Sequence, residues 1–76
     1  MKTVIVGGGK GCLAFLEFLG ARQLRELNIE VVCVVDTRAD APGVVFASQQ
    51  GIHTMTDYRA AIALPNVELI LELTGD

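Results

Sequence analysis

The 76-residue sequence has few of the features that mark nucleic-acid-binding, membrane or exported proteins. Its six basic residues are scattered and its net charge is −3, so no basic stripe is available to neutralise nucleic-acid phosphates. Its longest apolar runs, such as residues 31–35, are far shorter than the roughly 20 residues that span a bilayer, and no basic-then-apolar leader is present. We therefore expect a protein that binds neither nucleic acid nor membrane and that is not exported.

Cysteine and histidine are also scarce, with only Cys12, Cys33 and His53. Two cysteines do not make the disulfide framework of a small secreted domain, so a reducing cytoplasm is the expected location. His53 has no second histidine, and no cysteine or carboxylate at a usual ligand spacing, so no metal site is expected. Cys33 is predicted to be structural. Cys12 is predicted to be a small packing residue, with a redox-sensing thiol at a helix N-terminus as the alternative.

Short β-rich runs alternate with helical spacing along the whole chain. Strands are predicted over residues 3–6, 29–35, 52–54 and 67–73. Helices are predicted from 13 to 27, from a cap at Asp40 to 49 or 50, and from Thr56 or Asp57 to 65–66. This alternation implies parallel strands joined by right-handed crossovers. We therefore expect an α/β fold of three layers, in which a four-stranded parallel sheet of order 3-2-1-4 carries helices on both faces.

Apolar side chains extend beyond the face that each element needs for a small core. They are Val67, Leu69, Leu71 and Leu73 on one face of the fourth strand with Ile70 on the other, and Phe15, Phe18 and Leu19 on the first helix. An apolar edge strand invites pairing, whereas the helical residues can either fill the core or form a dimer face. We therefore expect one module, residues 1–76, that is the N-terminal part of a longer protein or that dimerises.

A glycine cluster follows the first predicted strand and opens the first predicted helix. Residues 7–12 read Gly-Gly-Gly-Lys-Gly-Cys, which matches G-x-G-x-x-G except that Cys12 takes the place of the last glycine. Such a turn offers a pyrophosphate free backbone N–H groups and the positive end of a helix dipole. The P-loop pattern is absent because Gly11 follows Lys10, so ATP hydrolysis is disfavoured. A tight turn that binds no ligand is the alternative.

An acidic residue, Asp36, ends the second predicted strand. At that place a carboxylate can accept hydrogen bonds from the adenosine ribose, and its charge repels a 2′-phosphate, so NAD is favoured over NADP. Arg38 lies two residues further on and can accept a 2′-phosphate, which keeps NADP open. Asp36 can also be an ordinary solvated loop residue.

Four segments together resemble the NAD-binding half of homoserine and aspartate dehydrogenases and of the glucose-fructose oxidoreductase family. They are residues 4–9 (Val-Ile-Val-Gly-Gly-Gly), 34–36 (Val-Val-Asp), 56–58 (Thr-Asp-Tyr) and 71–75 (Leu-Glu-Leu-Thr-Gly). The resemblance implies a Rossmann-like half domain, with Gly7, Gly9 and Gly11 at the pyrophosphate, Asp36 at the ribose, and Thr74 and Gly75 at the cofactor's flank. The residues that carry catalysis in those families fall outside this sequence, so no catalytic residue is predicted.

The sequence also resembles the N-terminal modules that precede PAS and histidine-kinase domains in bacterial signalling proteins, through residues 10–14 (Lys-Gly-Cys-Leu-Ala) and 72–75 (Glu-Leu-Thr-Gly). This second resemblance implies a nucleotide- or redox-sensing input domain. Coenzyme A and S-adenosylmethionine are further candidate ligands, because the fold hosts many functions. The predicted cofactor-binding residues are Gly7, Gly8, Gly9, Lys10, Gly11, Cys12, Asp36, Thr37, Arg38, Thr74 and Gly75.

Overall fold

A computed structural model describes residues 1–20 and 28–74 of the chain. The elements in order are β1 (Lys2–Val6), α1 (Lys10–Gly20), β2 (Glu30–Val35), α2 (Pro42–Gln49), β3 (His53–Met55), α3 (Tyr58–Ile62) and β4 (Leu69–Glu72). All pairings are parallel, and the strand order is β3-β2-β1-β4. The predicted α/β fold with the order 3-2-1-4 is therefore confirmed.

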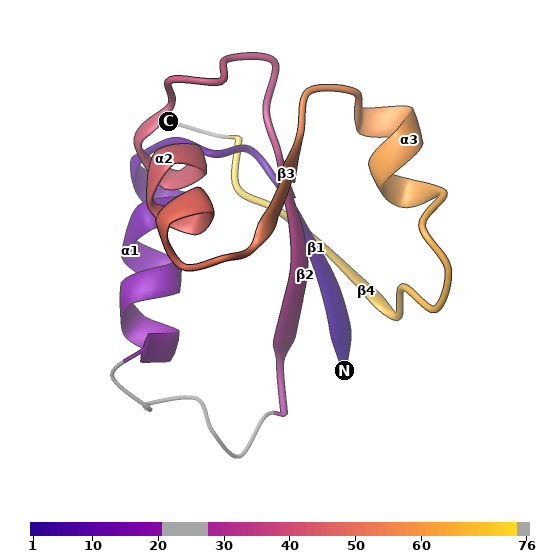
Figure 1. Cartoon of the computed structure of the whole chain (residues 1–76). Helices are drawn as coiled ribbons and strands as arrows, with labels where there is room; N and C mark the ends of the chain where they lie inside the picture. Colours follow the sequence, from indigo (N-terminus) through magenta and orange to yellow (C-terminus); the bar gives the residue numbers. More distant parts are fainter. Residues whose placement is uncertain (21–27, 75–76) are drawn as a thin grey trace.

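The sheet is covered by helices on both faces, with α1 and α2 on one side and α3 on the other (Figure 1). Because side chains alternate along a strand, neighbouring residues of β1 enter different layers of the core. Ile5 packs with Leu16 of α1 and Val44 of α2, whereas Val4 packs with Ala61 of α3. Both Val4 and Ile5 are fully buried, so β1 is the strand around which the two layers assemble.

The strands end together at one edge of the sheet. Val6 of β1 pairs with Val35 of β2 and with Glu72 of β4, and Val35 pairs with Met55 of β3. This register is the usual consequence of parallel pairing with crossovers that return to the same starting edge. It brings together the four segments that follow the strands, residues 7–9, 36–41, 56–57 and 73–74, and three of them, 7–9, 36–41 and 73–74, contribute to the candidate site.

Two predicted boundaries change at helix starts. α1 begins at Lys10 rather than at residue 13, because the Leu13 N–H already donates to the Gly9 carbonyl at 3.0 Å. The predicted continuation of this helix over residues 21–27 lies outside the described residues. Asp40 is not the cap of α2, since the cap position is Ala41 and has no side-chain hydrogen bond. The Gly43 N–H is satisfied instead by the Gly8 carbonyl at 2.6 Å.

Two further predictions concern the C-terminal part. Asp57, one of the two predicted caps, does cap α3, because its carboxylate accepts from the Arg59 N–H at 3.0 Å. β4 is shorter than the predicted 67–73, and Val67 does not share a face with Leu71. Val67 packs in the α3 layer because it precedes the strand, directly after Asn66 with its positive φ of 66°, so strand alternation does not apply to it.

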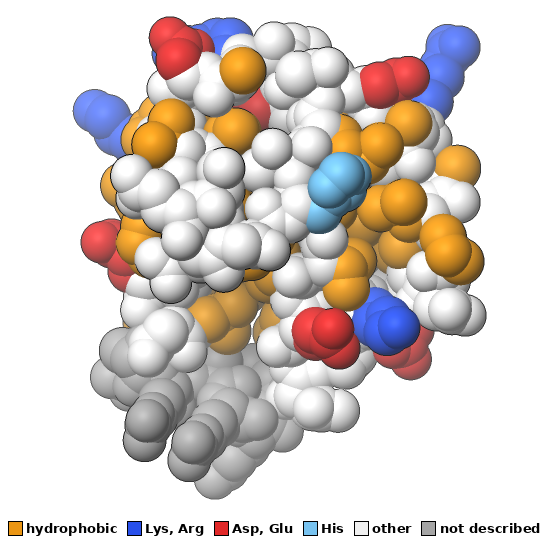
Figure 2. Space-filling model, viewed as in Figure 1, with side chains coloured by type: hydrophobic (Ala, Val, Ile, Leu, Met, Phe, Trp, Pro, Cys, Tyr) orange, Lys and Arg blue, Asp and Glu red, His pale blue; other side chains and the backbone are white. Residues whose placement is uncertain are grey.

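Apolar side chains remain exposed on the α3 side of the molecule, where Figure 2 shows hydrophobic atoms gathered to the right of the view. They include Tyr58, Ile62 and Ile70, whose exposed fractions lie between 38% and 47%. No helix within residues 1–20 and 28–74 is long and apolar enough to cross a membrane.

Candidate nucleotide site at the carboxyl edge of the sheet

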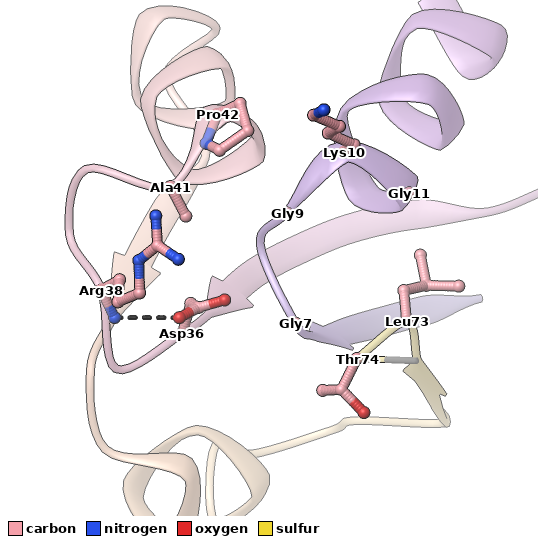
Figure 3. Close-up of a pocket in the computed structure, with 10 residues that line it drawn as sticks. All are labelled: Gly7, Gly9, Lys10, Gly11, Asp36, Arg38, Ala41, Pro42, Leu73 and Thr74. Atoms are coloured by element: carbon pink, nitrogen blue, oxygen red, sulfur yellow. Dashed lines mark hydrogen bonds between the residues drawn. The ribbon is translucent and has the colours of Figure 1, made fainter. Parts of the chain in front are cut away.

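A cleft of about 420 Å³ opens where the strands end (Figure 3). Its walls are the glycine turn with the start of α1, the loop that leads into α2, and the residues after β4. The lining residues are Gly7, Gly9, Lys10, Gly11, Asp36, Arg38, Ala41, Pro42, Leu73 and Thr74. Open parallel α/β sheets bind their ligands at such an edge, outside the carboxyl ends of the strands.

Gly7 is the point at which β1 turns into the site. Its φ of +103° suits glycine and strains other residues, and its N–H donates to the Val35 carbonyl at 2.8 Å. A Cβ at this position would lie 2.8 Å from the Leu73 carbonyl carbon and 2.8 Å from Thr74 Cγ2. The first glycine of the motif is therefore required by the contact between the turn and the end of β4.

Gly8 lies beneath the cleft and joins three segments. Its N–H donates to Asp36 Oδ2 at 2.8 Å, and its carbonyl accepts from the Gly43 N–H at 2.6 Å. A Cβ on Gly8 would overlap the Val44 Cγ2 methyl. The second glycine therefore lets α2 and the end of β2 approach the turn, and both of its backbone polar groups are used within the protein.

Asp36 extends from the end of β2 into the region below the glycine turn. Its Oδ1 accepts from the Arg38 N–H at 2.9 Å, and its Oδ2 accepts from Gly8. The bonds from the Arg38 and Gly8 amides lower the pKa of the Asp36 carboxyl, so the group is ionised at neutral pH. A carboxylate can accept about four hydrogen bonds, so both oxygens keep capacity for a ligand donor.

The start of α1 supplies the positive side of the cleft. The N–H groups of the first helical turn, which begins at Lys10, have no intrahelical acceptor. The Lys10 side chain stands beside this turn, and the Arg38 guanidinium projects into the opening from the facing loop (Figure 3). Arg38 Nε also lies 3.7 Å from Asp40 Oδ1, a pair so exposed that it contributes little stability.

Cys12 lies in the same first turn but is fully buried against the core. Burial, and secondarily the charge of Asp36, raises the pKa of the Cys12 thiol to about 11. A reactive thiol needs a lowered pKa, so the redox-sensing alternative for Cys12 is disfavoured and packing explains the residue. Burial also raises the pKa of the Cys33 thiol in the opposite layer.

The structure distributes the predicted site residues over three places. Gly8 and Cys12 lie beneath the turn, Thr37 lines a smaller neighbouring pocket, and Gly75 is outside the described residues. Seven predicted residues line the cleft: Gly7, Gly9, Lys10, Gly11, Asp36, Arg38 and Thr74.

Sequence reasoning missed Ala41, Pro42 and Leu73 as lining residues. The sequence predicts a helix that starts near Ala41 and Pro42, from a cap at Asp40, but only the fold shows that this start faces the glycine turn. Within the described ranges no group of three or more histidine, cysteine or acidic residues is placed to hold a metal ion.

No model of a known protein family matches the chain. No curated protein matches it significantly either. The function is therefore inferred from the geometry of the cleft, and the two sequence resemblances stay predictions.

Proposed function

We propose that this chain is a nicotinamide dinucleotide-binding module that takes NAD in preference to NADP. The observation that carries the proposal is the convergence, on one cleft, of a free helix N-terminus, two cationic side chains and an ionised carboxylate. These groups complement the two polar parts of a dinucleotide, namely its pyrophosphate and its ribose hydroxyls.

The pyrophosphate fits the α1 side of the cleft. The first-turn N–H groups and the helix dipole favour an anion there, and Gly9 and Gly11 allow it to approach the backbone. The Lys10 ammonium and the Arg38 guanidinium add positive charge from two sides of the opening (Figure 3). The N-terminus of α2 contributes less, because Pro42 has no N–H and the Gly43 N–H is already bonded to Gly8.

The ribose fits beside Asp36. The remaining acceptor capacity of this carboxylate matches a pair of vicinal hydroxyls. Because the lowered pKa keeps Asp36 ionised, a 2′-phosphate placed there meets a negative charge. Arg38 offsets only part of this repulsion, since its guanidinium also faces Asp40. NAD is therefore favoured, and NADP remains a weaker ligand of the same site.

In this proposal the chain only holds the cofactor, and any reaction of the bound cofactor with a substrate depends on a further domain or on a second copy of the chain. The titratable side chains that line the cleft are Lys10, Asp36 and Arg38, and each is assigned to holding the cofactor. Ile62 of α3 and Ile70 of β4 are exposed and offer apolar area to such a partner. We propose a cytoplasmic location, in keeping with the two free, buried cysteines.

Thermal unfolding with added ligand tests the proposal, because a ligand of the folded state raises the midpoint by mass action. We expect NAD⁺ and NADH to raise the midpoint of the wild type, and NADP⁺ to do so only at higher concentration. Lys10→Ala removes an exposed cation that lines the cleft, and it should reduce the shift without lowering the midpoint of the free protein.

Asp36→Asn and Asp40→Ala form a matched pair of loop variants. Each removes one negative charge from the loop between β2 and α2, but only Asp36 lines the cleft. We expect Asp36→Asn to weaken NAD binding and Asp40→Ala to leave it unchanged. If NAD⁺ raises the thermal midpoint of the two variants equally, the role proposed for Asp36 is contradicted. If no nicotinamide nucleotide raises the midpoint of the wild type at millimolar concentration, the proposal is contradicted and the glycine turn is structural.

A further inference from the structure

A second, smaller pocket of about 160 Å³ opens on the other side of Asp36. Val6 and Val35, at the ends of the two central strands, provide apolar lining, and Thr37 and Thr56 provide hydroxyl groups. Tyr58, at the start of α3, provides an aromatic ring. The pocket thus combines apolar surface, hydrogen-bonding groups and an aromatic face within the space of a single heterocycle.

The pocket adjoins the proposed nucleotide site through shared lining residues. Gly7, Asp36 and Thr74 line both the small pocket and the large cleft. A ribose held by Asp36 therefore has the positively charged cleft on one side and the aromatic pocket on the other. In an adenosine diphosphate the ribose joins the phosphate to the base, so the two cavities match the two substituents of that sugar.

On this arrangement, and resting on the proposed function, we infer that the small pocket receives the adenine ring, with Tyr58 covering one face of the base. Tyr58 is 47% exposed and lines the pocket, so its side chain keeps surface that a ligand can cover. Aromatic side chains bind nucleic-acid bases by stacking, because every base presents a flat π-face. The chain then binds the adenosine diphosphate half of the dinucleotide and treats oxidised and reduced cofactor alike.

A third cavity, of about 380 Å³, also includes Asp36 and competes for the base. It lies toward the edge strand β3 and is lined by His53 and Asp57. No phenyl, phenol or indole ring is among its lining residues. It shares only Asp36 with the phosphate cleft, whereas the Tyr58 pocket shares three residues with it. These differences favour the Tyr58 pocket.

The experiment measures ADP-ribose and NAD⁺ binding by titration calorimetry for the wild type, for Asp36→Asn and for three further variants. Removing an aromatic ring that stacks on a base weakens binding by roughly 5- to 150-fold. Because Tyr58 is half exposed, we expect Tyr58→Ala to weaken both ligands by about 5- to 20-fold, near the lower end of that range. Tyr58→Phe keeps the ring and should bind as the wild type does. His53→Ala, in the competing cavity, should also leave binding unchanged.

Tyrosine emission gives an independent readout, because Tyr58 is the only tyrosine and the chain has no tryptophan. Excited at the long-wavelength edge, where adenine absorbs little, the emission should change on addition of ADP-ribose. It should not change with nicotinamide mononucleotide, which lacks the adenine. Thermal midpoints of the free variants establish that each one is folded.

The outcomes separate this inference from the proposed function. If the wild type binds ADP-ribose, and Asp36→Asn weakens it but Tyr58→Ala does not, the base lies elsewhere and only the inference is overturned. Loss of binding in His53→Ala with retention in Tyr58→Ala overturns it in favour of the β3 cavity. If the wild type binds no nucleotide, the proposed function and the inference both fail.

Discussion

The contact between Gly8 and Val44 makes a quantitative prediction about how the glycine turn is packed. The backbone of Gly8 is not in the positive-φ region, so alanine is conformationally allowed there and gains about 0.4–1 kcal/mol through the unfolded state. The added methyl, however, would overlap Val44 Cγ2 in the core layer between α1 and α2. Overpacking of this kind costs about 1–3 kcal/mol.

We therefore expect Gly8→Ala to lower the free energy of unfolding by about 1.3 kcal/mol, the difference between the middle values of these two effects. For a domain of this size, each 1 kcal/mol lowers the midpoint by about 4–8 °C. Val44→Ala alone removes two methyl groups from a side chain that is 6% exposed, and should cost about 2 kcal/mol. In the double variant the overlapping methyl is gone, and the nearest remaining atom is Asp36 Cβ at 3.3 Å from the new Cβ.

The double variant should consequently be about as stable as Val44→Ala, with a favourable coupling energy of about 1 kcal/mol or more. Urea and thermal unfolding, followed by circular dichroism, give the stabilities of the wild type, the two single variants and the double variant. Gly11→Ala is the matched control, because its new Cβ would lie 4.0 Å from the Leu73 carbonyl oxygen and should stabilise the helix by about 0.5–1 kcal/mol. Additive effects of Gly8→Ala and Val44→Ala, or a Gly11→Ala variant as unstable as Gly8→Ala, would refute the packing argument.

Three further predictions follow from hydrogen bonds and burial. Asp57→Ala removes the side-chain cap of α3 and should cost about 1 kcal/mol in urea denaturation, whereas Asp57→Asn should cost less; equal losses would contradict the capping role. Asp36 has a lowered pKa, so its stabilisation is complete above its ordinary value of 3.8 and is lost as the pH falls through the folded value. The stability difference between wild type and Asp36→Asn should therefore be constant from pH 7 to about 5 and shrink at lower pH; a constant difference down to acid unfolding would refute it. With its pKa raised to about 11, Cys12 should react with Ellman's reagent at pH 8 only slowly until urea unfolds the chain, and rapid reaction of the native protein would show an accessible thiolate.

The order of the strands was predictable because it depends on features that are local in the sequence. Alternating strand and helix patterns imply parallel pairing and right-handed crossovers, and these rules leave few arrangements of four strands. The glycines of the turn and Asp36 were predictable for a similar reason, since each follows a strand whose end lies at the same edge.

Other contacts were not predictable because they depend on the path of loops between elements. Residue preferences favour Asp40 over Ala41 as the cap, and only the approach of Gly43 to the Gly8 carbonyl makes a side-chain cap unnecessary. Likewise, the sequence predicts either a ribose contact or a solvated loop residue for Asp36, but neither of the bonds that its carboxylate accepts from the Gly8 and Arg38 amides. The bonds of Gly8 with Asp36 and with Gly43 join residues that are distant in the sequence, and no periodicity encodes them.

The contact of Gly7 with the Leu73 backbone has a consequence for how the site comes into being. The first glycine and the last described strand are neighbours in space but stand at opposite ends of the sequence, and the Leu73 N–H closes the ladder onto the Val6 carbonyl at 2.8 Å. Contacts of such long sequence separation form late and slowly, because the loop-closure entropy must be overcome first. During synthesis the turn is made before β4, and it gains this wall only after β4 has emerged from the ribosome and paired with β1. The proposed anion binding should therefore appear in one step with the docking of β4, so that ligand binding reports on the completed four-stranded sheet.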